Sequence, residues 1–161
     1  MFTMFYEHEV DGSPVILPLL AHYPKDKDAF SIDNEFLLQD RILVRPVMQH
    51  GVSKVGVYFP ALDEKKTVGD VWYDADNYQK YERVGKESIA VNDYKKERIR
   101  RSSPLMKNDP YTLIVCLDRN GKAEGTLYLD DEKSFDYRQG KFIYINYPMK
   151  RPTSYANLVW P

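Results

Sequence analysis

Short apolar runs dominate the chain from Arg41 onward, and they constrain its fold more than any other feature. Each run is rich in β-branched and aromatic residues, and glycine, proline, asparagine or aspartate separates it from the next. The runs are ILVRPVM, KVGVYFP, DVWYD, YTLIVCLD, GTLYLD and KFIYINY. Short strands at such intervals are typical of an antiparallel sandwich or meander. We therefore predict a mostly β protein.

The first forty residues have a different pattern. MFTMFYEHEVDG places Phe2, Phe5 and Tyr6 on one helical stripe and stops at Gly12, a typical left-handed cap, which predicts the last turns of a helix. The continuous apolar run PVILPLLAHY predicts a strand covered on both faces, as in a parallel sheet. Pro18 weakens this prediction because proline cannot donate to a strand ladder.

Turn and cap signals predict three further local features. Asp33 is placed to cap a short helix through NEFLLQD. Asn120-Gly121, between YTLIVCLD and GTLYLD, is the strongest hairpin signal, and Gly140 predicts another turn. Cys116 is the only cysteine, and its apolar neighbours predict a buried strand residue that fills the core.

The charge balance gives no general attraction to nucleic acid or to an anionic membrane. The 23 basic and 24 acidic residues leave a formal charge of −1. No run approaches the roughly 18 apolar residues of a membrane span, and the first residues lack the features of a secretory signal. The basic run KKERIRR, residues 95–101, has no interleaved aromatic side chains and is interrupted by Glu97, which favours a solvated face over a nucleic-acid site.

The acidic stretch Asp130-Asp131-Glu132, followed by Asp136, permits three interpretations: a metal loop, a catalytic site or a turn. A calcium loop alternates its oxygen ligands and needs a glycine at the bend, whereas these acids are adjacent. Catalytic carboxylates face each other across a cleft, which sequence neighbours rarely do. We therefore predict a solvated strand end that enters a turn.

Other candidate sites are weaker. The scattered His8, His22 and His50 lack the spacing of a zinc site, and Ser102-Ser103 lack the glycine elbow of a nucleophile. No catalytic, metal or cofactor residue is predicted. Trp72, Tyr73 and Tyr78 are compatible either with a sugar-stacking surface or with side chains that cover a β-sandwich core.

Six segments of the chain, taken in order, resemble the late part of a glycoside hydrolase family 31 enzyme. They are FYEHEVDGSPVILPLLAHYPKD, FSIDNEFLLQDRILVRPV, VYFP, VWYDADNY, RIRRSSPLMKNDPYTLIVCLD and GTLYLDDEKSFDY. RRSS followed by MKNDP is the most specific piece and points to the glucosidase II branch of the family. The resemblance covers residues 2–145 and maps the acidic stretch onto a hairpin segment, Y-L-D-D-G.

The resemblance implies a domain organisation and a parent enzyme. Residues 1–42 would be a remnant of the last strand and helix of a (β/α)8 barrel, residues 43–147 an antiparallel β-sandwich, and residues 148–161 an irregular tail. The parent would be a retaining α-glucosidase of the endoplasmic reticulum lumen that trims α-1,3-linked glucose from N-glycans and pairs with a regulatory β subunit. Its catalytic aspartates and sugar-binding residues lie upstream, so we expect an inactive fragment that holds no catalytic or substrate-binding residue. A non-catalytic sandwich that binds carbohydrate or protein is the alternative.

The chain departs from the family pattern at four places. Gln39 stands where the family usually has a glycine, Leu17 where a basic residue commonly follows the first strand, and Glu132 where the glycine of D-D-G would be. Near residues 94–95, SIAVNDYK runs straight into KERIRRSS and skips a stretch that normally supplies sandwich strands. We therefore expect missing strands there, as in a truncated, misspliced or mispredicted gene product.

Overall fold

The computed structural model describes residues 1–91 and 113–150 of the 161-residue chain. The helices are α1 (Phe2–Asp11) and α2 (Leu19–His22), with 3₁₀ turns η1 (Lys27–Ser31) and η3 (Asp136–Gln139). The strands are β1 (Ile16–Pro18), β2 (Phe36–Leu38), β3 (Ile42–Val44), β4 (Lys54–Phe59), β5 (Trp72–Tyr73), β6 (Lys80–Tyr81), β7 (Gly85–Ala90), β8 (Lys122–Ala123), β9 (Thr126–Leu129), β10 (Ile143–Asn146) and β11 (Met149–Lys150). Strands thus predominate in this part of the chain, which confirms the mostly β prediction.

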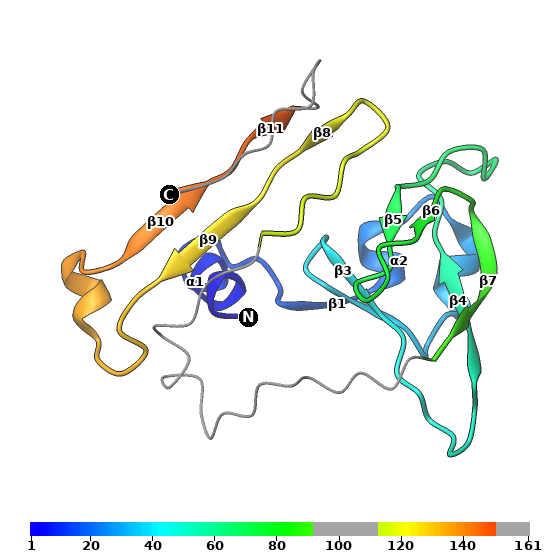
Figure 1. The fold of residues 1–161 in the computed structure, drawn as a ribbon, viewed down its shortest axis with the longest axis horizontal. Coiled ribbons are helices and arrows are strands. Elements are labelled where there is room, and N and C mark those ends of the chain that lie inside the picture. The colour runs from blue at the N-terminus through cyan, green and yellow to red at the C-terminus, as the bar shows by residue number, and fades with distance from the viewer. Residues whose placement is uncertain (92–112, 151–161) are drawn as a thin grey trace.

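All the strand pairs of the described residues are antiparallel and form small sheets. β1, β2 and β3 form a three-stranded sheet, and the others form the pairs β4–β7, β5–β6, β9–β10 and β8–β11. The Tyr147 N–H donates to the Gly125 carbonyl at 2.8 Å between the last two pairs, so these pairs continue one another as a ribbon. Figure 1 shows this ribbon at the left with α1 packed beside β9, and β4–β7, β5–β6 and α2 together at the right.

The main core lies where α2, η1 and β2 meet β4. Its buried members are Leu19, Tyr23, Ala29, Leu37 and Tyr58. Leu37, the central residue of β2, is fully buried, while its neighbours on the strand are only partly buried. This alternation follows from the two-residue period of a strand.

A second cluster packs α1 against the ribbon. The rings of Tyr6 and Tyr128 stack with centroids 4.2 Å apart, and Phe142 packs against both at 5.3 and 5.5 Å. The helix ends at Gly12 in the left-handed region (φ 77°), with its N–H bonded to the His8 carbonyl, which confirms the predicted cap.

The predicted helix is confirmed as α1, but two of the three residues on its apolar stripe do not face the core. Phe2 and Phe5 are 46% and 53% exposed. Two polar residues lie on the inner face instead: Thr3 accepts the Tyr128 N–H, and Glu7 bonds to groups of β9 and β10. Apolar periodicity cannot find a helix face that uses hydrogen bonds as well as apolar contacts.

The predicted doubly covered strand over PVILPLLAHY is also wrong. Only Ile16–Pro18 are extended, Ile16 is 61% exposed, and β1 pairs with β2 antiparallel. Pro18 is the last residue of β1 and the N-cap of α2. At the end of a strand its missing N–H does not interrupt the hydrogen bonds of the sheet.

The segment predicted as a helix through NEFLLQD is a strand and a turn. Phe36–Leu38 form β2, and the chain reverses into β3 at Gln39, whose φ is 51°. Asp26, not Asp33, caps a helical turn in this region: its side chain accepts the Asp28 N–H at 3.1 Å at the start of η1. Burial of Leu37 outweighs the weak helical preference of so short a segment.

The prediction for YTLIVCLD is wrong in the residues that the structure describes. Residues 113–118 form no strand, Leu113, Ile114 and Val115 are 59%, 51% and 40% exposed, and Cys116 is exposed. The turn itself is confirmed, since the Gly121 N–H donates to the Asp118 carbonyl and Gly121 has φ 71°. The strand after the turn pairs elsewhere, because β8 takes β11 as its partner.

Other predictions have mixed outcomes. Gly140 has φ 83° and ends η3, as expected for a turn glycine. Met149–Lys150 form β11 within the tail that was predicted to be irregular. The sequence analysis missed β6 and β7, and the predicted gap near residues 94–95 lies outside the described residues.

Candidate functional site

The acidic stretch that attracted attention in the sequence forms a turn. Asp130 Oδ1 accepts the Glu132 N–H at 2.8 Å, and Asp131 Oδ1 accepts the N–H groups of Lys133 and Ser134 at 3.2 and 3.0 Å. Tyr128 donates its hydroxyl to Asp130 Oδ2 at 2.8 Å. These carboxylates hold their own loop in shape, as aspartates do in turns, and the turn prediction is confirmed.

A hollow of about 390 Å³ borders this turn and is lined by Asp130, Asp131, Glu132, Lys141 and Phe142. Glu132 has φ 56°, and its Oε2 is buried with no hydrogen-bond partner among the described residues. Across residues 1–91 and 113–150, no three His, Cys, Asp or Glu side chains gather closely enough to hold a metal ion.

The aromatic residues considered as a sugar-stacking surface do not form one. Trp72 packs against the main core, with its ring centroid 6.2 Å from that of Phe59. Tyr73, the next residue on β5, points to the opposite face, as alternation in a strand requires. Tyr78 lies in the following loop and is 57% exposed. The structure therefore separates the three rings.

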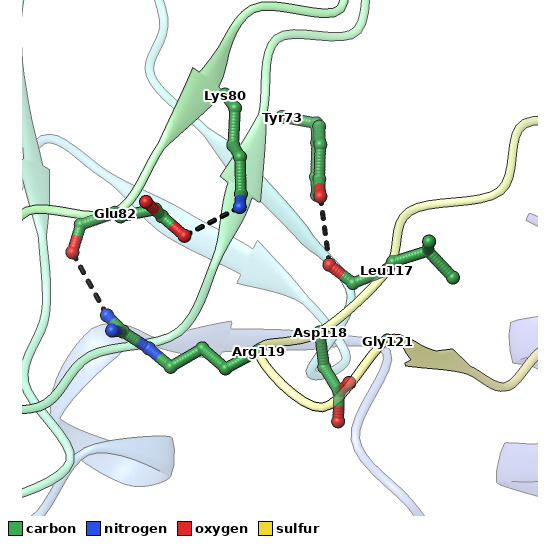
Figure 2. Close-up of a pocket in the computed structure, with 7 residues that line it drawn as sticks. All are labelled: Tyr73, Lys80, Glu82, Leu117, Asp118, Arg119 and Gly121. Atoms are coloured by element: carbon green, nitrogen blue, oxygen red, sulfur yellow. Dashed lines mark hydrogen bonds and ion pairs between the residues drawn. The ribbon is translucent and has the colours of Figure 1, made fainter. Parts of the chain in front are cut away.

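Tyr73 instead lines an open pocket of about 470 Å³ between the β5–β6 hairpin and the turn before β8. In Figure 2, Tyr73 and Lys80 extend from the hairpin toward the turn, and Arg119 extends from the turn toward Glu82. Asp118 lies on the turn and points away from Lys80 and Tyr73. We call this pocket the hairpin pocket.

Hydrogen bonds fix the walls of the hairpin pocket. Tyr73 donates its hydroxyl to the Leu117 carbonyl at 2.9 Å. Lys80 Nζ lies 2.6 Å from Glu82 Oε1, and Arg119 donates to the Glu82 carbonyl at 3.1 Å. A second bond from Arg119, to the Gly69 carbonyl at 3.1 Å, anchors the guanidinium. The two sides of the pocket are thus tied together.

The electrostatics of the hairpin pocket are balanced. The residues that line the pocket include two cations, Lys80 and Arg119, and two anions, Glu82 and Asp118. The hydrogen bond from Lys80 lowers the pKa of Glu82, and the Lys122 N–H, with that of Asn120, lowers the pKa of Asp118. Both carboxylates are therefore ionised at neutral pH, and the four charges sum to zero.

Two buried carboxylates, which the sequence analysis did not single out, connect the first forty residues to β4. Asp26 is fully buried, and its Oδ2 accepts the Tyr58 hydroxyl and the Ala61 N–H, both at 2.8 Å. Glu35 accepts the Tyr58 N–H with both oxygens, at 2.9 and 3.1 Å, and lies 3.9 Å from Arg45 Nε. Burial raises the pKa of Glu35 and that of the Tyr58 hydroxyl. Their contacts make these groups structural.

Glu7 is a third partly buried acid, with a side chain that is 13% exposed. Its Oε1 accepts the hydroxyls of Thr126 and Tyr144 at 2.6 and 3.1 Å, and its Oε2 accepts Gln39 Nε2 at 3.0 Å. Burial alone would raise the pKa of Glu7, but these bonds and the nearby Arg41 hold it below its usual value. Glu7 thereby joins α1, the β2–β3 turn and the ribbon.

The remaining candidates from the sequence show no shared site. His8 bonds to the Ser13 carbonyl, His22 packs edge-on against Tyr23, and His50 is exposed. The lysines and arginines of residues 95–101, and Ser102-Ser103, lie outside the described residues. Desolvation of its thiol raises the pKa of Cys116, although the residue is exposed, so its thiol is less ionised than a free one at neutral pH.

Residues 12–152 match the family model of the glycosyl hydrolase family 31 C-terminal domain. The chain belongs to glycosyl hydrolase family 31. The match spans both the β1–β3 sheet and the strands that follow, and it agrees with the small antiparallel sheets of the structure.

Relatives in the family have similar sequences and a similar fold. The chain is 38% identical to neutral alpha-glucosidase AB of Dictyostelium discoideum over 166 residues, and 42% identical to that of Sus scrofa over 152 residues. These alignments cover 92% and 86% of the chain, but only 17% and 16% of the relatives. The fold also matches a crystal structure of the ER glucosidase II heterodimeric complex, which consists of the catalytic subunit and the binding domain of the regulatory subunit. The TM-score is 0.76 and the sequence identity 30%, and the match covers 91% of this chain and 17% of the chain in that structure. The chain thus spans about one sixth of the proteins it resembles.

Two of the departures expected from the resemblance have a clear geometry. Gln39 and Glu132, where the resemblance led us to expect glycine, both adopt positive φ, at 51° and 56°. Side chains rarely adopt this left-handed region, while glycine enters it at no steric cost. At both positions the backbone therefore has a conformation that glycine favours, while the residue present carries a side chain.

Proposed function

We propose that this chain is the C-terminal supporting part of a retaining α-glucosidase of the glucosidase II type. The observation that carries the proposal is sequence similarity along almost the whole chain to neutral alpha-glucosidases and to the catalytic subunit of ER glucosidase II. The whole enzyme would act in the endoplasmic reticulum lumen, would remove α-1,3-linked glucose from N-glycans, and would associate with a regulatory β subunit.

The chemistry of the whole enzyme requires two carboxyl groups about 5 Å apart on either side of the glycosidic bond, one as nucleophile and one as general acid. The acidic turn does not supply such a pair, because Asp130 and Asp131 accept hydrogen bonds from their own loop. We propose that the reacting aspartates lie in the five sixths of the enzyme that this chain does not span. The isolated chain would then be inactive.

Exposed apolar side chains supply the surface for that larger part. On α1, Phe2, Phe5 and Val10 are 46%, 53% and 66% exposed, and Ile16 of the neighbouring β1 is 61% exposed. Large apolar side chains exposed to water on two successive elements are typical of a surface that another part of the protein covers. We propose that the catalytic barrel of the enzyme covers this face.

The domain division remains part of the proposal. Residues 1–42 would belong to the end of the barrel and residues 43–147 to the sandwich. Two observations bear on the boundary: β3 begins at Ile42, and the C-terminal domain match begins at residue 12. With the division at residue 42, the Asp26–Tyr58 bond links the two parts.

Reconstitution tests the proposal. The purified chain alone should not hydrolyse a chromogenic α-glucoside. Co-expression with the remaining N-terminal part of the Sus scrofa relative, truncated before the matching segment, should produce a complex that does. Phe5→Glu should weaken this complex, whereas the matched control Lys133→Glu, on an exposed residue of the acidic turn, should not. Hydrolysis by the chain alone, with a defined pH optimum, would refute the proposal.

Helices of membrane-spanning length and composition do not occur in the described residues, where the longest helix, α1, has 10 residues.

A further inference from the structure

The hairpin pocket has the size and shape of a small-molecule site. Its volume of about 470 Å³ lies within the range of about 300–1,000 Å³ that is usual for ligand pockets. Its polar walls come from segments far apart in sequence, since Tyr73 and Lys80 belong to the hairpin while Leu117 and Arg119 belong to the turn before β8. The pocket is therefore built by the fold and not by one local loop.

The bonds already made by the walls decide which groups remain for a ligand. Tyr73 gives its hydroxyl proton to Leu117, so its oxygen can only accept another bond. Lys80 uses one of three N–H donors on Glu82, whose second carboxylate oxygen can accept. Arg119 uses Nε and Nη2 on two carbonyls, and Nη1 can still donate.

The two sides of the pocket thus offer both donors and acceptors, while the charges of the lining residues sum to zero. A ligand with a large net charge would gain little from such walls. A ligand with many hydroxyl groups suits it, because each hydroxyl both donates and accepts. The ring of Tyr73 offers contact to the C–H face of a sugar ring.

We propose that the hairpin pocket binds a neutral saccharide of one or two hexose units. The site is independent of the α-glucosidase proposal, because its residues need no catalytic carboxylate. This site is a version of the carbohydrate-binding alternative considered from the sequence. It uses Tyr73, Lys80, Glu82 and Arg119, whereas the surface considered earlier used Trp72, Tyr73 and Tyr78. The walls are held by hydrogen bonds before the ligand arrives, so little ordering opposes binding.

NMR titration of the full ¹⁵N-labelled chain tests this site. Maltose should produce saturable shifts at the Gly121 amide and at the Arg119 Nε–H, with a dissociation constant on the order of 1 mM. Lys80→Ala should weaken maltose binding by about tenfold, as expected for one lost bond to a charged donor. Lys133→Ala is the matched control, since it removes an exposed lysine far along the chain and should leave the titration unchanged.

A second variant separates binding from folding. Tyr73→Phe keeps the ring but removes the oxygen that accepts from the sugar, and it should also weaken binding while the spectrum stays folded. Three results would overturn the proposal: no saturable shift with maltose, equal affinity in wild type and both variants, or tighter binding of the charged analogue gluconate than of maltose. Loss of α-glucosidase reconstitution would not affect this outcome, because the titration uses the chain alone.

Discussion

Glu132→Gly should stabilise the protein, and the structure gives two separate reasons. Glu132 has φ 56°, and its Oε2 is buried without a hydrogen-bond partner in the part of the chain that the structure describes. The left-handed backbone costs a residue with a side chain about 1–2 kcal/mol. The greater flexibility of glycine in the unfolded state offsets about 0.4–1 kcal/mol of this stabilisation. Relief of the backbone alone should therefore be worth about 0.5–1 kcal/mol.

Removal of the unpaired oxygen adds to this gain. A buried polar atom without a partner costs about 1–3 kcal/mol, and we take the lower end because the residue as a whole is only partly buried. The expected total for Glu132→Gly is about 1.5–2 kcal/mol, which for a chain of this size raises the midpoint of thermal unfolding by about 3–8 °C. The bond from the residue 132 N–H to Asp130 Oδ1 remains in the variant.

Glu132→Ala separates the two effects. Alanine also removes the unpaired oxygen, but it leaves a side chain in the left-handed region. Urea unfolding followed by circular dichroism should give the order wild type, then Ala, then Gly, with a final step of about 0.5–1 kcal/mol. If the glycine variant were no more stable than the alanine variant, the reasoning about backbone strain would be wrong. An alanine variant no more stable than wild type would contradict the reasoning about the buried oxygen.

Four further perturbations test other features. Leu37→Ala, at a fully buried site, should lower the free energy of unfolding by about 2–5 kcal/mol in urea, and a loss below 1 kcal/mol would contradict the assigned core. Tyr58→Phe removes the hydroxyl that donates to Asp26 and should cost about 1–3 kcal/mol; a neutral result in the same assay would show that the bond contributes nothing net. The pKa of Glu7 is lower in the folded protein than its ordinary value of 4.5, so the stability that its carboxylate provides is present above pH 4.5 and is lost as the pH falls through the pKa of the folded state. Glu7→Gln should therefore flatten the acid side of the stability–pH curve, and an unchanged curve would refute this role. Cys116 should react with a maleimide in the native protein, more slowly than a free thiol at the same pH because its pKa is raised, whereas reaction only after unfolding would show that it is buried.

The sequence was most informative where local pattern and turn chemistry agreed. Gly12, Gly121 and Gly140 all adopt the positive φ that their positions indicated, and the acidic stretch is the predicted turn. Five short apolar runs became β3, β4, β5, β9 and β10 for the same reason. These features depend on residues close together in the chain.

The errors came from contacts between distant residues. NEFLLQD is a strand because Leu37 is buried against α2 and β4, which no local preference encodes. The buried acids Asp26 and Glu35 look like loop residues in the sequence, since their partner, Tyr58, lies 32 and 23 residues away. The hairpin pocket was missed for a similar reason. Only the fold brings Arg119 to Glu82, although the presence of Tyr73 in a candidate sugar surface was a partial signal.

The bond from Thr126 to Glu7 has a consequence for how the protein is made. The two residues are 119 positions apart, so at a synthesis rate of about 5–20 residues per second Glu7 leaves the ribosome roughly 6–24 s before its partner exists. During that interval α1 has neither the ribbon beneath it nor the hydroxyls that its acid accepts. The helix α1 can therefore pack only after residues 126–144 have been synthesised. A nascent chain that stalls before then would leave the apolar side chains of α1 exposed to chaperones.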